Sequence, residues 1–128
     1  MCRQEPQFDE YGMTQWWWLA RHKENLVLGK NTEIGNFTVL GCDYGIEIQD
    51  NVKIGYNCTI MTHSSIDNRQ GSVVLKKNCK IGANSVVMPG ITIGENSIVG
   101  ACSFVNQSIP DSQIWYGVPA RFVRNVDE

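Results

Sequence analysis

The stretch "LKKNCKIGANSVVMPGITIGENSIVGACSFV", residues 75–105, places an aliphatic residue at every sixth position. In order, these residues are Leu75, Ile81, Val87, Ile93, Val99 and Val105. The same spacing, with extra residues near Ile46 and before Leu75, gives an earlier series at Leu28, Ile34, Leu40, Ile48, Ile54, Ile60 and Ile66. A fixed short period of this kind is typical of a solenoid. The repeat therefore decides the fold class.

Each six-residue unit also carries residues that favour a tight corner. Asparagine dominates three positions after the aliphatic residue, at Asn31, Asn51, Asn57, Asn78, Asn84 and Asn96. Asparagine is one of the few residues besides glycine that tolerate the left-handed backbone region. An amphipathic helix would need apolar residues three and four apart, and an antiparallel strand would need longer alternating runs. The pattern therefore predicts an all-β fold, a parallel β-helix of hexapeptide repeats.

The bulk composition narrows the function classes. The chain has 128 residues, with 11 Lys and Arg interleaved among 13 Asp and Glu and a net charge of −2. It has no basic stripe, so we expect neither nucleic acid nor a membrane as a partner. The five cysteines form no CxxC pair, which argues against a zinc site and a disulfide framework. With no signal-like N-terminus and no apolar run of spanning length, we expect a cytoplasmic protein with reduced thiols.

This repeat resembles that of the left-handed β-helix acyltransferases of the hexapeptide-repeat superfamily. The resemblance implies a triangular prism with three six-residue units in each coil, stacked about 4.8 Å apart. It predicts an N-terminal cap over residues 1–27, a left-handed parallel β-helix over 28–109 with a loop at 67–74, and a C-terminal tail over 110–128.

In such a prism, units three apart lie on one face. If both insertions bulge outward, the units that begin at Leu40, Ile60, Ile81 and Val99 form one column. The residues at its corners are Thr62 with His63, Ala83 with Asn84, and Ala101 with Cys102, above Asp43. We therefore expect His63 to point outward on the edge that carries Ala83 and Ala101. As an alternative, His63 merely replaces asparagine at a corner, because histidine also tolerates the left-handed region.

The stretch "IMTHSSIDNRQG", residues 60–71, looks like the catalytic segment of maltose and galactoside acetyltransferases. The resemblance implies that His63 is a general base, which takes a proton from the acceptor as that acceptor attacks the thioester of acetyl-CoA. It gives Asn57 and Asp67 as acceptor-binding residues. As alternatives, Asn57 is an ordinary corner asparagine, the default corner residue in this chain, and Asp67 is a solvated carboxylate on the loop beside His63. Either Asp67 or Asp43 could orient the histidine.

The stretches "IGANSVVMPGITIGENSIVGACSFVNQSIP" (81–110) and "GVPARFVRNV" (117–126) resemble the last coils and tail of the sugar acetyltransferases. The resemblance implies that the backbone at Ala83 and Ala101 hydrogen-bonds the pantetheine arm of acetyl-CoA. Arg121 and Arg124 are then expected to meet its phosphates, which the planar guanidinium suits. Relatives often carry a Thr-Lys pair where this chain has Asn-Gln at 106–107, so one positive contact is missing.

These features predict an acetyl-CoA-dependent acetyltransferase that uses no metal and modifies a hydroxyl or amino group of a sugar or similar small polar acceptor. We expect the acceptor to be a sugar or a nucleotide-linked sugar. The family resemblance implies a homotrimer with sites between subunits. Two alternatives are a non-catalytic scaffold and a γ-type carbonic anhydrase, which needs three histidine ligands where the chain offers His22 and His63. The acceptor, O- or N-acetylation, and the role of Trp16–Trp18, as an end cap or as stacking residues, stay open.

Overall fold

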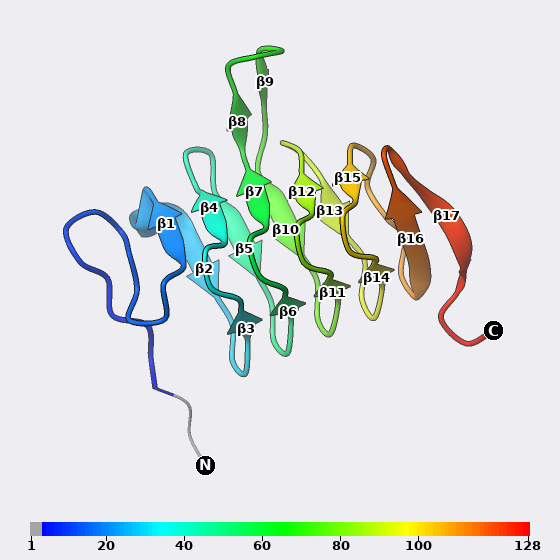
Figure 1. Cartoon of the computed structure of the whole chain (residues 1–128), viewed down its shortest axis with the longest axis horizontal. Coiled ribbons are helices and arrows are strands. Elements are labelled where there is room, and N and C mark those ends of the chain that lie inside the picture. Colours follow the sequence, from blue (N-terminus) through cyan, green and yellow to red (C-terminus); the bar gives the residue numbers. More distant parts are fainter. Residues whose placement is uncertain (1–3) are drawn as a thin grey trace.

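The protein is a solenoid whose coils stack into three sheets, parallel except for the last strand, and the computed structural model describes residues 4–128 (Figure 1). Face 1 contains β1 (Leu19–Arg21), β4 (Val39–Gly41), β7 (Thr59–Met61), β12 (Val86–Val87) and β15 (Phe104–Val105). Face 2 contains β2 (Leu26–Leu28), β5 (Ile46–Ile48), β10 (Val73–Leu75) and β13 (Thr92–Ile93). Face 3 contains β3 (Glu33–Ile34), β6 (Lys53–Ile54), β11 (Lys80–Ile81), β14 (Ile98–Val99), β16 (Gln113–Gly117) and β17 (Ala120–Asn125). Outside these faces lie the 3-10 helix η1 (Lys23–Asn25) and the hairpin of β8 (His63–Ser64) and β9 (Arg69–Gln70).

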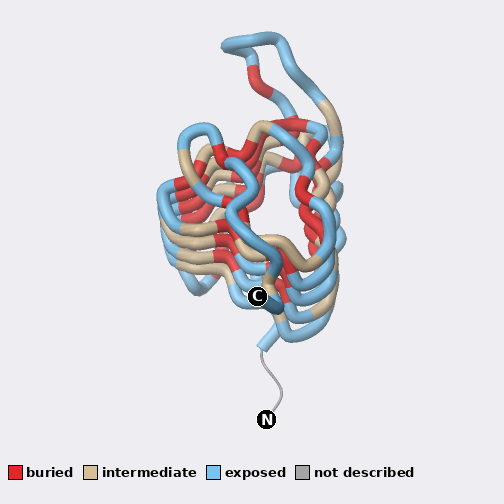
Figure 2. Tube along the Cα trace, turned by 90° about the vertical axis from the view of Figure 1, so that its right-hand side faces the viewer, coloured by how far each residue is buried: buried red, intermediate tan, exposed pale blue. Residues whose placement is uncertain are grey.

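The aliphatic residues of the six-residue repeat fill the interior. The parallel register stacks Ile60 on Leu40 below it and on Val87 above it, and all three side chains are fully buried. Figure 2 shows the buried positions lining the inside of the coils. Burial of apolar surface contributes about 25 cal/mol per Å² and drives this stacking. The predicted all-β parallel β-helix is confirmed.

Asparagine turns the corners in the left-handed region, as the sequence predicts. Asn51, Asn78 and Asn96 stack between faces 2 and 3 with φ values of 63°, 65° and 62°. The backbone N–H of each donates to a carbonyl of the preceding coil. Glycine serves where coils approach most closely, since a Cβ on Gly82 would lie 2.5 Å from the backbone nitrogen of Ala101.

Both ends of the solenoid extend further than expected. Strand β1 pairs with β4 from Leu19 onward, so the first coil begins within the predicted cap segment 1–27. The buried ring of Trp18 packs edge-to-face on Phe8, with ring centroids 5.7 Å apart, and covers the open end of the core. At the other end β16 adds to β14, and β17 returns antiparallel to it. No helix within residues 4–128 is long and apolar enough to cross a membrane.

The hairpin β8–β9 projects from the prism as its largest excursion (Figure 1). It starts at His63, and Val73 already pairs with Ile46 on face 2, so the excursion lies earlier than the expected loop at 67–74. Ile66 stands near its tip and is 95% exposed. The sequence spacing counts Ile66 as a core position, and this one misassigned unit shifts every later column.

The predicted column of His63 with Ala83 and Ala101 is therefore wrong. Ile81 pairs with Ile54 and Val99 on face 3, whereas Ile60 pairs on face 1. We call the border between faces 1 and 2 the histidine edge, with residues His22, Asp43 and His63. The border between faces 3 and 1 is the alanine edge, with residues Trp17, Phe37, Asn57, Asn84, Cys102 and the neighbouring Ala83 and Ala101. Face 1 separates the two edges within one chain.

Candidate active site

His63 is held by the buried Thr62 at the base of the hairpin. The Thr62 hydroxyl donates to the Gly41 carbonyl at 2.7 Å and accepts from the Tyr44 backbone N–H at 2.9 Å. The backbone N–H of Gly71 then donates to the Thr62 carbonyl at 2.9 Å, which closes the hairpin. His63 itself pairs with Gln70 across β8 and β9 and is exposed. The imidazole thus stands in solvent on a backbone that is fixed on both sides.

The ring beside His63 belongs to Tyr44, a residue that the sequence patterns did not single out. The two ring centroids lie 5.9 Å apart with the planes inclined at 54°. Tyr44 follows Asp43 in the coil below, and its backbone bond to Thr62 keeps it next to the histidine. The only sequence signal for it is its place at the corner one coil before His63.

Among the described residues, neither Asp43 nor Asp67 forms a hydrogen bond or ion pair with His63. Asp43 Oδ2 lies 3.6 Å from His22 Nε2, and His22 Nδ1 lies 3.5 Å from Glu24 Oε1. Asp67 sits at the far end of the hairpin, next to Asn68, whose φ of 58° makes the turn. Asp67 therefore lies at the opposite end of the hairpin from His63. Within residues 4–128, no three His, Cys, Asp and Glu side chains gather as a metal site.

The alanine edge offers a smooth strip of backbone. Ala83 and Ala101 lie one coil apart, because Ile81 pairs with Val99. The Cys102 N–H donates to the Ala83 carbonyl at 2.9 Å, which fixes the spacing. Asn57 lies one coil below Ala83 on this edge, and its side-chain amide donates to the Asn84 side-chain oxygen at 2.8 Å. The structure thus brings Asn57, Ala83 and Ala101 together and leaves His63 on the other edge.

The two arginines lie at different points of the C-terminal hairpin. Arg121 stands at the start of β17, beside the turn that covers the top of the alanine edge, where the Gly117 N–H donates to the Ser103 hydroxyl. Its guanidinium donates to the Asn106 side-chain oxygen at 3.4 Å. Arg124 lies nearer the other end of β17 and donates to the carbonyl of Glu128 at 2.7 Å. Both side chains are exposed.

The thiols inside the solenoid cannot act as nucleophiles. Burial raises the pKa of Cys79 to about 12, and burial with the nearby charges of Asp43 and Glu24 raises that of Cys42 to about 12 as well. Burial also raises the pKa of the Cys58 thiol. A thiol attacks as the thiolate, so these groups are inert near neutral pH.

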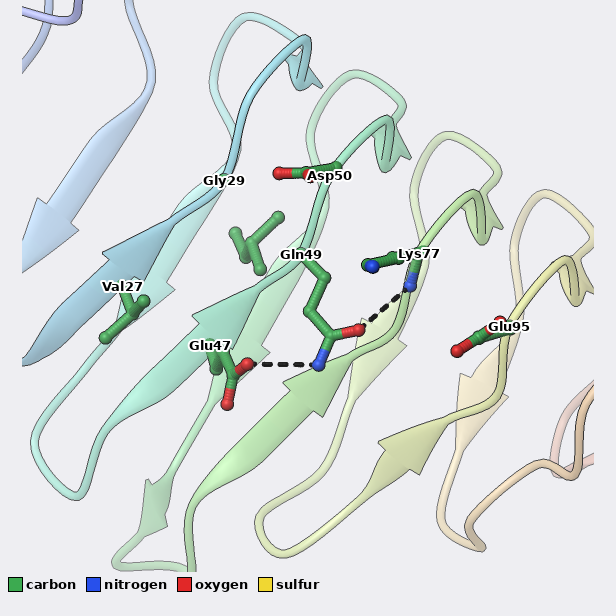
Figure 3. A pocket seen from close by; sticks show the side chains of 8 residues that line it. Val27, Gly29, Glu47, Gln49, Asp50, Lys77 and Glu95 are labelled. Atoms are coloured by element: carbon green, nitrogen blue, oxygen red, sulfur yellow. Dashed lines mark hydrogen bonds between the residues drawn. The ribbon is translucent and has the colours of Figure 1, made fainter.

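Figure 3 shows the residues that line a shallow groove on the described surface. It runs over face 2 and the neighbouring corner, where Val27, Glu47, Gln49 and Lys77 line it. The Gln49 amide donates to the Glu47 carboxylate at 3.0 Å and accepts from the Lys77 backbone N–H at 3.2 Å. Both ends of the Gln49 side-chain amide are thus hydrogen-bonded within the groove. His63, Ala83 and Arg121 do not line this groove.

Comparison with known proteins places this geometry in a family. Residues 72–107 match the family model described as bacterial transferase hexapeptide (six repeats). The chain is 30% identical over 115 residues to YvoF of Bacillus subtilis, a protein named as an acetyltransferase, and the match covers 87% of this chain and 67% of YvoF. It is 33% identical over 115 residues to galactoside O-acetyltransferase of Escherichia coli, covering 81% of this chain and 56% of that enzyme.

A solved structure agrees with these relatives. The hexapeptide-repeat-containing acetyltransferase VCA0836 of Vibrio cholerae, complexed with acetyl coenzyme A, superimposes with a TM-score of 0.80 at 29% identity. The match covers 87% of this chain and 66% of that one, so the chain spans about two thirds or less of several proteins that it matches. The predicted fold class, an all-β left-handed parallel β-helix, is confirmed. The chain belongs to the hexapeptide-repeat acyltransferase superfamily.

Proposed function

We propose that this protein is an acetyl-CoA-dependent acetyltransferase that modifies a hydroxyl or amino group of a sugar or a similar small polar acceptor. The observation that carries the proposal is the pair of edges at the two borders of face 1. One edge presents the exposed His63 on a fixed backbone, and the other presents the strip of Ala83 and Ala101. The names of the galactoside enzyme and of the acetyl-CoA complex agree with this chemistry.

The two edges meet if the protein is a homotrimer. Face 1 points apolar side chains outward along most of its length, namely Leu19, Val39, Val86 and Phe104. Faces 2 and 3 instead expose the charged Glu47, Lys53 and Lys80. An apolar surface of this length favours a partner. Three copies with face 1 toward a common axis form a closed ring, in which the histidine edge of one subunit adjoins the alanine edge of the next.

The positions of these residues along the solenoid axis also agree with a site shared between two subunits. Asn57 precedes β7 and His63 follows it, so both lie on the same coil. With parallel solenoid axes, His63 of one subunit faces Asn57 of its neighbour, and Ala83 and Ala101 lie about 5 and 10 Å further along the edge. Arg121 lies at the C-terminal end of the solenoid, where its guanidinium donates to Asn106 after β15. Acetyl-CoA is then expected to lie with its phosphates toward Arg121 and Arg124 and its thioester near His63.

The chemistry is a direct transfer. The lone pair of the acceptor oxygen or nitrogen forms a bond to the thioester carbonyl carbon, while a nitrogen of His63 takes the acceptor proton. The carbon–sulfur bond then breaks, and the coenzyme A sulfur leaves as the thiol after the imidazolium returns the proton. No acyl-enzyme is needed, because the acceptor attacks the thioester directly. Asn57, and Asp67 from the hairpin, are expected to contact the acceptor.

Replacement of His63 by alanine tests the proposal. We expect kcat to fall by about 10²- to 10⁴-fold, because a positioned general base contributes that much to the rate. The thermal shift caused by acetyl-CoA should persist, because the alanine edge is intact. His22→Ala is the matched control, since this second histidine lies two coils below and pairs with Asp43. Full turnover by His63→Ala would contradict the assignment, and the absence of any acetyl-CoA shift in the parent protein would favour a scaffold.

A further inference from the structure

Two aromatic residues occupy corner positions that this chain fills with asparagine elsewhere. Along the alanine edge, the residues in the left-handed region are Trp17, Phe37, Asn57, Asn84 and Cys102, with φ values of 66°, 68°, 55°, 61° and 59°. A bulky residue with positive φ is a costly outlier, whereas asparagine tolerates this region. The Phe37 N–H donates to the Trp17 carbonyl at 2.6 Å, so the two residues lie on adjacent coils.

The aromatic side chains at these corners do not stabilise the core. Trp17 is 59% exposed and Phe37 is 65% exposed. The neighbouring Trp18 is the residue that packs into the core, against Phe8. Trp17 and Phe37 thus combine an unfavourable backbone with apolar surface in water. Such positions persist in proteins when they serve binding.

Trp17 and Phe37 lie on the side of the proposed reaction centre that acetyl-CoA does not occupy. Asn57 is level with His63 of the neighbouring subunit in the proposed trimer. Ala83 and Ala101 continue the alanine edge toward the C-terminus and are taken by the pantetheine arm. Phe37 and Trp17 continue it in the opposite direction, about 5 and 10 Å away at one coil each. An acceptor that delivers its hydroxyl or amine to His63 therefore has to lie over these two rings.

We propose that Trp17 and Phe37 stack on the rings of the acceptor and select an uncharged acceptor with two linked rings, such as a disaccharide or an aryl glycoside; this rests on the proposed function. The first ring carries the reacting group and covers Phe37, and the second covers Trp17. A nucleotide-linked sugar would place a pyrophosphate between its rings, which cationic side chains normally bind. On this wall of the cleft, residues 14–17, 35–37 and 55–57 contain no Lys or Arg. The facing histidine edge adds Arg21 and Lys23 but also Glu24 and Asp43, so the cleft carries no net positive charge at this level.

The variants Phe37→Asn and Trp17→Asn test this role, because they install the residue that other corners carry and so relieve backbone strain. We expect each to raise the KM for phenyl β-galactoside about tenfold, as the loss of one ring contact should, with the KM for acetyl-CoA unchanged. Tyr11→Asn is the matched control, because Tyr11 is 76% exposed on the N-terminal turn, off the edge. Quenching of tryptophan fluorescence by the glycoside, lost in Trp17→Asn, gives a readout that needs no turnover.

A panel of acceptors distinguishes the outcomes. We expect phenyl β-galactoside and maltose to exceed galactose and a nucleotide-linked amino sugar in kcat/KM by about tenfold, with the advantage lost in both variants. The stacking role would be overturned if the acceptor KM were unchanged in the variants or if the variants dissociated the oligomer. It would also be overturned if the parent protein preferred the nucleotide-linked sugar or turned over no two-ring glycoside. Loss of turnover in His63→Ala beside unchanged KM in the aromatic variants would overturn the stacking alone. Full turnover in His63→Ala would overturn the proposed function instead.

Discussion

The thiol of Cys79 lies fully buried in the solenoid, and burial raises its pKa from about 9 to about 12. Cys58 is also buried, and its pKa is raised for the same reason. A protonated, buried thiol packs as a small apolar group. The sequence already indicates this role, because both cysteines stand four positions after an aliphatic residue of the repeat, where small side chains recur.

We expect the stability of the protein to fall as the pH rises from about 9 toward about 12. The pKa of Cys79 is higher in the folded state than in the unfolded state. The protonated thiol therefore contributes fully to the free energy of unfolding below the unfolded-state pKa, and this contribution is lost as the pH approaches the folded-state pKa. Urea midpoints at about pH 8 and about pH 10.5 measure this decline. Cys79→Ala should be less stable at both values but should decline less between them. An equal decline in both proteins would contradict this account.

At the scale of elements, the six-residue repeat predicts the coils correctly up to the hairpin β8–β9 but does not predict where the hairpin begins. The six-residue spacing reaches Ile66, but the backbone has already left the prism at His63. Spacing alone cannot distinguish an aliphatic residue in the core from one on a loop, and this misplaces Ala83 and Ala101 relative to His63. The coils after Leu75 contain no insertion, so the one-coil separation of Ala83 and Ala101 follows from the sequence.

Shortening the hairpin tests what its tip contributes. Replacement of residues 65–68 by Asn-Gly joins Ser64 to Arg69 through the turn that two-residue hairpins favour. We expect Tm to change by about 2 °C or less, because the exposed Ile66 at the tip adds nothing to the core. The acceptor KM should rise, since the proposed function gives Asp67 on this tip a contact with the acceptor. Asp67→Asn separates the carboxylate from the rest of the tip, and an unchanged acceptor KM in the shortened protein would show that the hairpin forms no wall.

At the scale of the whole molecule, the single chain presents two half-sites. The sequence identifies the members of each half, but it gives no information on how two copies meet. That information lies in the outer surface of face 1, where Val39, Val86 and Phe104 alternate with buried positions. Their apolar character becomes meaningful only after the strands are assigned to faces. Assembly is therefore the step for which the structure adds most to the sequence.

Subunit complementation tests the shared site directly. His63→Ala removes one half-site, and Ala101→Trp should obstruct the other without disturbing the core, because Ala101 is exposed. Each variant alone should retain about 1% of the parent activity or less. After co-refolding in equal amounts, about a quarter of the sites in a cyclic trimer combine an intact histidine edge with an intact alanine edge, so about a quarter of the parent activity should return. Light scattering should give three times the 14.4 kDa chain mass in every sample. A trimer that recovers no activity would mean that the reaction does not use two subunits.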